Sequence, residues 1–220
     1  MLIRTIAALT ILTGIAPLAV AETSSLHAGR ALVSEFITGV STLSSRFEQT
    51  LIDASGEVLE VTSGTLEIKR PGQFRWAYDE PYEQWLIADG LNLWIYDVDL
   101  AQVTVKPQAQ ALANTPALLL GGSASVLDQF EYDGSYEDGG LTWVRMSPIS
   151  TDSGFKRMEL AFSGRMLARM VFIDNLEQTT LVSLSDAVIN EEIDSAHFEF
   201  IVPEGVDVVG TPAVVEIDVP

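Results

Sequence analysis

Few residues of this chain have the types and spacing that catalysis requires. The two histidines, His27 and His197, lie far apart and lack the paired spacing of metal ligands. Around residues 121–123 there is no G-x-S-x-G turn to present a serine nucleophile, and no glycine-rich phosphate loop occurs. We therefore expect no metal site and no nucleophilic or phosphate-binding enzyme.

Acidic side chains do cluster, and two carboxylates could act as general acid and base in glycoside hydrolysis. The clusters are Asp79-Glu80, Asp97 with Asp99, Glu137-Asp138, and Glu191-Glu192 with Asp194. All of them fall at predicted turns and strand ends, where solvated charge is the ordinary arrangement. The sequence therefore predicts a protein that is not an enzyme and that uses no cofactor.

Arg70 is the charged residue with the most unusual setting. Along its predicted strand, Leu66 and Ile68 form an apolar row that Arg70 continues. A guanidinium on an apolar face is costly unless its donors are satisfied. Backbone carbonyls at helix ends, after the first helix or before residues 121–122, are the expected partners, which would make Arg70 a latch between sheet and helices. The alternative is a strand-end arginine that reaches solvent just before Pro71.

The elements around Arg70 follow from periodicity. An amphipathic helix is expected from about Ser24 to Val40, because apolar residues recur there every three or four positions. The period then changes to two, with turns at short intervals, which predicts an antiparallel meander. A second helical segment is expected between Pro107 and Tyr132, with a cap at Thr115-Pro116. Strands then resume, and the tail is expected to be an ordered crossing. The pattern predicts a large antiparallel sheet with two helical insertions.

Apolar rows on one face of these strands exceed what the predicted helical segments can cover. The rows include Phe74 with Trp76, Leu93 with Ile95, Met158 with Leu160, and Met166, Ala168, Met170 and Phe172. The surplus indicates a cavity, for which methionine is a compliant lining. A well-packed core is the alternative.

An export signal precedes the domain. Residues 6–20 are apolar, and Ala19-Val20-Ala21 has the small-x-small pattern that signal peptidase reads. The apolar run is shorter than the ~20 residues of a membrane span. We expect cleavage after Ala21, and no lipid anchor, because no cysteine follows.

Charge and composition narrow the partners. The 220-residue chain has 12 Lys and Arg against 31 Asp and Glu, a formal net charge of −19, and no cysteine. This charge excludes nucleic acid and favours basic partner surfaces, although solubility or an ancestral saline habitat would also explain it. No linker, repeat or low-complexity tract occurs, so we expect a signal peptide at 1–21 and a single domain at 22–220.

Short motifs in a fixed order resemble the LolA family of outer-membrane lipoprotein carriers. They are Phe47-x-Gln49, Ser63-Gly64-x-Leu66, Lys69-Arg70-Pro71-Gly72-x-Phe74-Arg75-Trp76, Asp89-Gly90-x-x-Leu93-Trp94-x-Tyr96-Asp97, Gln102-Val103, and Asn114-Thr115-Pro116-Ala117-x-Leu119-Leu120. The resemblance covers essentially the whole mature length. It implies a mainly β fold, an unclosed antiparallel β-barrel of about 11 strands whose concave apolar face is covered by a helical lid.

The resemblance also implies roles. Arg70 matches the arginine that hydrogen-bonds the lid, and Phe74 matches an aromatic residue at the cavity entrance. The expected acyl-chain residues are Phe47, Leu66, Ile68, Phe74, Trp76, Leu93, Ile95, Leu118, Leu119, Met158, Leu160 and Met170. The protein would be a monomeric periplasmic chaperone that takes acylated lipoproteins from an inner-membrane ABC-type release complex and passes them to an outer-membrane lipoprotein acceptor.

Two departures from the family leave partner specificity open. The chain is more acidic than expected, and its C-terminus continues past Glu204-Gly205. The main alternative is a carrier or sensor of another amphiphile, such as a glycolipid, that uses the same half-barrel.

Overall fold

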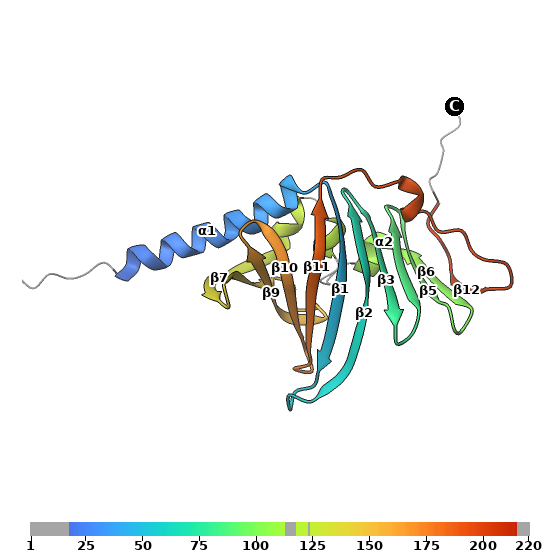
Figure 1. Ribbon diagram of the computed structural model, residues 1–220, viewed down its shortest axis with the longest axis horizontal. Coiled ribbons are helices and arrows are strands. Elements are labelled where there is room, and N and C mark those ends of the chain that lie inside the picture. The colour runs from blue at the N-terminus through green and yellow to red at the C-terminus, as the bar shows by residue number, and fades with distance from the viewer. Residues whose placement is uncertain (1–17, 113–117, 123, 215–220) are drawn as a thin grey trace, which may run out of the picture.

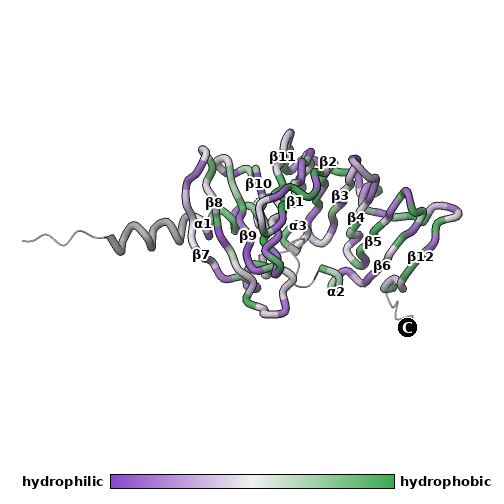
Figure 2. Tube along the Cα trace, turned by 90° about the horizontal axis from the view of Figure 1, so that it is seen from below, coloured by the Kyte–Doolittle hydropathy of each residue, from purple (hydrophilic) through white to green (hydrophobic). Residues whose placement is uncertain are grey.

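The computed structural model describes residues 18–112, 118–122 and 124–214 (Figure 1). Its strands are β1 (Thr42–Ile52), β2 (Val58–Lys69), β3 (Gln73–Glu80), β4 (Gln84–Asp89), β5 (Asn92–Asp97), β6 (Gln102–Pro107), β7 (Phe130–Asp138), β8 (Leu141–Pro148), β9 (Phe155–Ser163), β10 (Met166–Asp174), β11 (Thr179–Ile189) and β12 (Asp207–Gly210). They form one twelve-stranded sheet in the order β12-β6-β5-β4-β3-β2-β1-β11-β10-β9-β8-β7. Seen from below, the strands follow an arc that stays open on one side (Figure 2).

Strands that follow one another in each half of the chain are antiparallel neighbours. β1 pairs with both β2 and β11 and so joins the meander β1–β6 to the meander β7–β11. The last strand differs, because β12 runs parallel to β6. In the described part of the chain, β7 and β12 are the two free edges. The prediction of an unclosed, mainly antiparallel barrel is confirmed, with twelve strands rather than about 11 and one parallel pair.

Both predicted helical segments are present. The helical elements are α1 (Leu18–Gly39), α2 (Gln108–Leu112), α3 (Leu118–Gly121), and the 3₁₀ turns η1 (Ala124–Gln129) and η2 (Ser195–Phe198). α3 lies within the arc of strands and α2 at its open side (Figure 2). α1 begins earlier than predicted, and the cap expected at Thr115-Pro116 lies outside the described residues. Among the described helices, none combines the length and apolarity that a membrane crossing requires.

α1 packs through the apolar stripe that its sequence predicts. Val33, Phe36, Ile37 and Val40 are all buried against the concave face of the sheet. The ring of Phe36 meets Phe162 of β9 edge-on, with 5.9 Å between centroids. Because Val33, Phe36 and Ile37 follow i, i+3 and i+4 spacing, they lie along one side of α1, and Val40 continues this apolar stripe just past the end of the helix.

The face assignment predicted for β10 is wrong at one end. The period-two pattern places Met166, Ala168 and Met170 in one apolar row, but the register against β9 shifts between Leu167 and Arg169. Leu167 therefore joins Met170 in the core, and Ala168 is half-buried. A β-bulge adds a residue to one strand and exchanges the faces of the residues beyond it.

The C-terminal segment crosses the convex face, and the prediction of an ordered tail is confirmed. Phe198 is fully buried there, and the ring of Phe200 stacks on Trp94 with 5.5 Å between centroids. After β12, the side chain of Asn92 holds the backbone of Ala213 by two hydrogen bonds, of 3.1 and 2.7 Å. The tail thus covers outward-facing aromatic residues of the meander.

Candidate functional site

Arg70 lies immediately after β2, where the sheet meets two helical segments. Its Nη1 donates a hydrogen bond to the carbonyl oxygen of Val40, just past the end of α1, at 2.9 Å. Its Nη2 donates to the carbonyl oxygen of Leu119 in α3 at 3.2 Å. The guanidinium carbon also lies 5.0 Å from the centroid of the Phe36 ring, within range of a cation–π interaction. One side chain therefore connects the sheet to α1 and α3.

The guanidinium of Arg70 is largely shielded from solvent, which affects both its pKa and its hydrogen bonding. Desolvation lowers the pKa of the guanidinium to about 10, which still leaves it charged at neutral pH. A buried charged group needs all its donors satisfied, yet the Nε atom of Arg70 is buried without a hydrogen-bond partner among the described residues. Arg70 therefore holds a positive charge where the sheet meets α1 and α3.

The turn that follows β2 also holds α2. The backbone N–H of Gly72 donates to the carbonyl oxygen of Gly121, at the end of α3, at 2.7 Å. Gln108, the first residue of α2, donates through Nε2 to the carbonyl oxygen of Gly72 at 2.6 Å and accepts through Oε1 from the N–H of Gly90 at 3.0 Å. Gln108 was not predicted from sequence, because nothing in a glutamine at a helix start indicates that its side chain bonds two turns distant in the chain.

An apolar cavity of about 150 Å³ lies in the concave face below α3. It is lined by Gln49, Phe74, Trp76, Tyr78, Leu86, Leu120, Met170, Phe172 and Val182. Phe74, Trp76 and Met170 are among the acyl-chain residues predicted from sequence. Phe172 lies in an apolar row from which the sequence predicts a cavity. The other five are not among the predicted acyl-chain residues, because the curvature of the sheet decides which of its inward residues meet.

Tyr78 and Gln49 lie between this cavity and a more polar pocket of about 330 Å³, and they line both. The Tyr78 hydroxyl and the Gln49 Oε1 atom are 3.3 Å apart and hydrogen-bonded. Burial raises the pKa of Tyr78 to about 12, so the hydroxyl is neutral. The outer pocket also includes Glu60 and Asp97. An amphiphile would thus meet apolar surface inside and polar groups outside.

The other predicted acyl-chain residues form the packed core beside the cavity. Phe47, Leu66, Ile68, Leu93, Leu119, Met158 and Leu160 are buried in this core, and Ile95 packs against it. The side chain of Leu118 lies outside the described residues. The ring centroids of Phe47 and of Trp76, which lines the cavity, are 4.7 Å apart. The concave face therefore holds a small cavity within a well-packed core, so both sequence-based alternatives hold in part.

His197 and Glu159 have structural partners. No group of three metal-ligating side chains occurs in the described ranges. His197 lies 3.0 Å from Glu67 and ties the tail to β2. The buried carboxylate of Glu159 on β9 pairs with Arg145 at 3.1 Å and with Arg157 at 3.3 Å. This arrangement can hold the sheet together and resembles no acid–base pair.

The fold is similar to that of a protein of known structure. A crystal structure of an uncharacterized conserved protein from Thermus thermophilus matches with a TM-score of 0.51 at 13% identity, covering 84% of this chain and 98% of that one. At this identity, the likeness concerns the fold alone.

Comparisons of sequence are more specific. The chain matches the family model for outer membrane lipoprotein carrier protein LolA over residues 38–201. The outer-membrane lipoprotein carrier protein of Azotobacter vinelandii is 40% identical over 178 residues, covering 80% of this chain and 86% of the relative. The protein of that name from Bordetella avium is 37% identical over 199 residues, covering 90% of this chain and 95% of the relative. The chain therefore belongs to the LolA family of outer-membrane lipoprotein carrier proteins.

Proposed function

We propose that this protein carries lipoproteins through the periplasm and shelters their acyl chains against the concave face of the sheet. The observation that carries the proposal is the Arg70 junction, which holds α3 over an apolar cavity in a member of this family. The names of the relatives support lipoprotein as the cargo. They do not favour the alternative of a glycolipid carrier or sensor.

Acyl chains would first occupy the existing cavity beside Phe74, Trp76 and Met170. That cavity, at about 150 Å³, is small compared with the ~300–1,000 Å³ of ordinary ligand pockets. Loading therefore requires α3 to move outward from the sheet. Leu119 would move with it, and core residues such as Leu66 would then become part of the acyl-chain site.

The energetics suit a carrier that must also release its cargo. Sheltering about ten methylenes contributes ~8 kcal/mol, at ~0.8 kcal/mol each. Before any opening cost, this corresponds to about micromolar affinity. The hydrogen bonds that Arg70 donates to Val40 and Leu119 stabilise the closed state by roughly 1.5–3 kcal/mol each. Closure by Arg70 thus lowers cargo affinity enough to permit onward transfer.

The proposal extends to location and partners. Cleavage after Ala21 would leave residues 22–220 as a monomeric single-domain carrier and would remove the first residues of α1. An inner-membrane ABC-type complex would load the carrier, and an outer-membrane lipoprotein acceptor would unload it. The acidic charge, −19 for the full 220-residue chain, favours basic docking surfaces on both. Transfer needs no catalysis and no cofactor, because differences in affinity drive it.

The test is release of a radiolabelled triacylated lipoprotein from spheroplasts by the purified mature protein. We expect a soluble one-to-one complex in the supernatant. A folded protein that releases nothing from a competent membrane would contradict lipoprotein carriage. Mass analysis of copurified amphiphiles would then identify another cargo.

A further inference from the structure

Basic residues gather on strands β8, β9 and β10, although the chain as a whole is strongly acidic. Residues 141–174, which form these strands and their connections, contain five of the 12 Lys and Arg but only three of the 31 Asp and Glu. The three strands are therefore a basic region of an acidic protein. A local region of opposite charge can determine which partner binds and in which orientation.

Strand alternation places arginines of this region on the convex face of the sheet. On β9, Met158 and Leu160 are buried in the core of the concave side. Arg157 and Glu159 alternate with them and therefore point to the opposite side. Arg145 of β8 pairs with Glu159 across the two strands, so it shares the convex face.

The carboxylate of Glu159 fixes the position of two guanidinium groups. Its Oε1 atom lies 3.1 Å from Nε of Arg145 and 3.3 Å from Nε of Arg157, and its Oε2 atom accepts a hydrogen bond from the Tyr136 hydroxyl at 2.6 Å. Glu159 is only 8% exposed, whereas the two arginine side chains are 44% and 47% exposed. Two exposed cations thus share one buried anion, and the group has a net positive charge.

Most donors of these guanidinium groups point to other uses. Each guanidinium has five N–H donors. The ion pairs with Glu159 are made through Nε, which leaves the Nη groups to meet a partner. Arg169 of β10 is exposed nearby, because it pairs with Ala161, the next convex residue of β9 after Glu159. We call Arg145, Arg157, Arg169 and Glu159 the arginine cluster.

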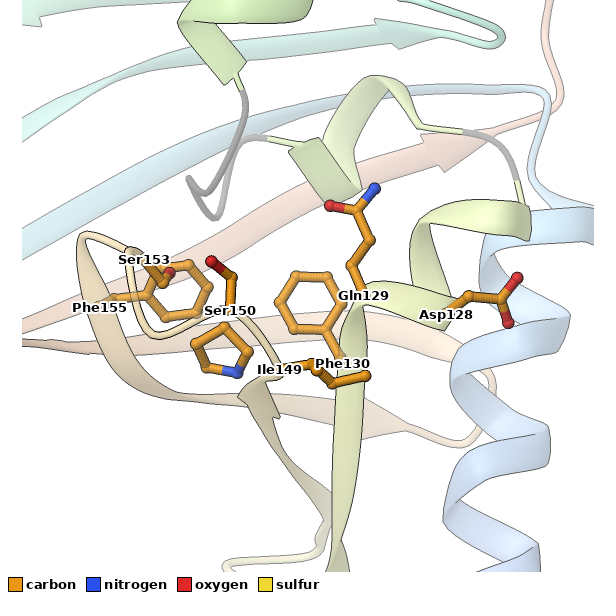
Figure 3. A pocket seen from close by; sticks show the side chains of 8 residues that line it. Asp128, Gln129, Phe130, Ile149, Ser150, Ser153 and Phe155 are labelled. Atoms are coloured by element: carbon orange, nitrogen blue, oxygen red, sulfur yellow. The ribbon is translucent and has the colours of Figure 1, made fainter.

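The start of β9 is held in place as well. Phe155, two residues before Arg157, is buried, and its ring centroid lies 6.2 Å from that of Phe130. Both rings line an apolar pocket of about 260 Å³ at this end of the sheet (Figure 3). The N–H of Ile149 donates to the carbonyl oxygen of Gln129 at 2.9 Å, which joins η1 to the loop between β8 and β9. Arg157 is therefore presented by a strand whose first residues are fixed.

Acidic side chains border the arginine cluster. Asp133 of β7 hydrogen-bonds to Ser147 of β8, and Glu177, in the turn after β10, pairs with Lys156. The cluster is thus a basic patch within an acidic surround. An anionic phospholipid surface would be repelled by the surround. A protein that carries an acidic patch within a basic surface complements both parts of this pattern.

We propose that the arginine cluster docks a membrane-anchored protein through a patch of Asp or Glu side chains that lies within a basic surface. The proposal rests on the function proposed above, because a carrier that exchanges cargo at a membrane has to be positioned there. Arginine suits this task, since its planar fork binds a carboxylate through two hydrogen bonds. Docking on the convex face leaves the concave face free for cargo.

Binding of the fluorescently labelled mature protein to spheroplasts, which expose the periplasmic face of the inner membrane, tests the proposal. Arg157→Gln removes one charge of the cluster and leaves Arg145 to pair with Glu159. Arg46→Gln is the matched control, since Arg46 is exposed on β1 outside the cluster. We expect Arg157→Gln to bind about tenfold more weakly than wild type, and Arg46→Gln to bind within about twofold. Added salt should weaken wild-type binding.

Cargo binding provides the control for folding. All three proteins should bind a radiolabelled tripalmitoylated lipopeptide with equal affinity, because both substitutions lie on the face opposite the cavity. Equal binding of wild type and Arg157→Gln to spheroplasts would overturn the docking surface, and release of lipoprotein by wild type from the same spheroplasts would show that carriage is intact.

Two further outcomes separate the partner from the carrier function. Binding that survives proteolysis of the spheroplast surface, or that vesicles of the extracted phospholipids reproduce, would mean that the partner is a lipid surface and would overturn the proposal. Binding that depends on Arg157 without any release of lipoprotein would support the docking surface and contradict carriage.

Discussion

Other parts of the chain cover both faces of the sheet, but they are held in different ways. On the concave face, polar contacts at one turn hold α3, chiefly from Arg70 and Gly72, and a cavity lies beneath it. On the convex face the tail is held along its length, by burial of Phe198, the β12–β6 ladder and the Asn92 clamp. We infer that α3, the concave cover, opens in function, and that the C-terminal tail, the convex cover, is a permanent part of the fold.

The largest expected effect is on the convex face. Phe198→Ala removes a fully buried ring from beneath the tail and should lower the free energy of unfolding by about 3–5 kcal/mol. Urea denaturation measures this loss. Lipopeptide affinity of the folded fraction should stay unchanged, because the ring lies on the face opposite the cavity. A loss below about 1 kcal/mol would mean that the tail is a detachable cover after all.

On the concave face, Tyr78 predicts a pH dependence. Its pKa is raised from 10.0 to about 12 by burial, so the folded state holds the proton more tightly than the unfolded chain does. Stability contributed by Tyr78 is therefore complete below pH 10 and is lost as pH rises toward 12, by about 2–3 kcal/mol at ~1.36 kcal/mol per unit. Tyr78→Phe should lose less stability than wild type over this range. If wild type and Tyr78→Phe lost the same stability between pH 10 and 12, the raised pKa would not belong to Tyr78.

Gln108 and Asn92 allow a direct comparison of the two covers, because each is a buried amide that makes two hydrogen bonds. Gln108→Ala leaves the carbonyl of Gly72 and the N–H of Gly90 without this partner. We expect a loss of about 1–3 kcal/mol in unfolding free energy. Hydrogen exchange at Gly72 should also accelerate, because the turn that holds α3 loosens. If hydrogen exchange at Gly72 stayed unchanged, the contacts of Gln108 in α2 would not help to hold the turn that binds α3.

Asn92→Ala is the matched change on the tail side. Its loss of stability should be similar or smaller, about 1–2 kcal/mol. Limited proteolysis should cut near Ala213 more readily, while hydrogen exchange at Gly72 stays at the wild-type rate. Coupled changes at both places would show that the two covers are one cooperative unit.

Much of the sheet could be predicted from sequence, because alternation and tight turns report local geometry directly. The bulge after Leu167 could not, since a register shift depends on how β9 and β10 fit together. The parallel pairing of β12 with β6 could not be predicted either, because a segment of four exposed residues has no apolar alternation.

The site divides in the same way. Arg70 could be found because a charge that continues an apolar row stands out from its strand. Gln49 and Tyr78 could not, because polar residues within a strand become part of a cavity only through the curvature of the sheet. The partners of Gln108 come from two separate turns, and no local pattern connects them.

The most direct test of a latch that opens is the transfer of bound cargo. A radiolabelled tripalmitoylated lipopeptide is bound to wild type, Arg70→Leu and Arg70→Lys, and its passage to excess lipid vesicles is timed. Lysine keeps the charge but lacks the planar fork with which Arg70 reaches both Val40 and Leu119. We expect both variants to retain lipopeptide longer than wild type, Arg70→Leu by at least about tenfold. Release from Arg70→Leu at the wild-type rate would contradict the claim that Arg70 closes the concave cover and lowers cargo affinity.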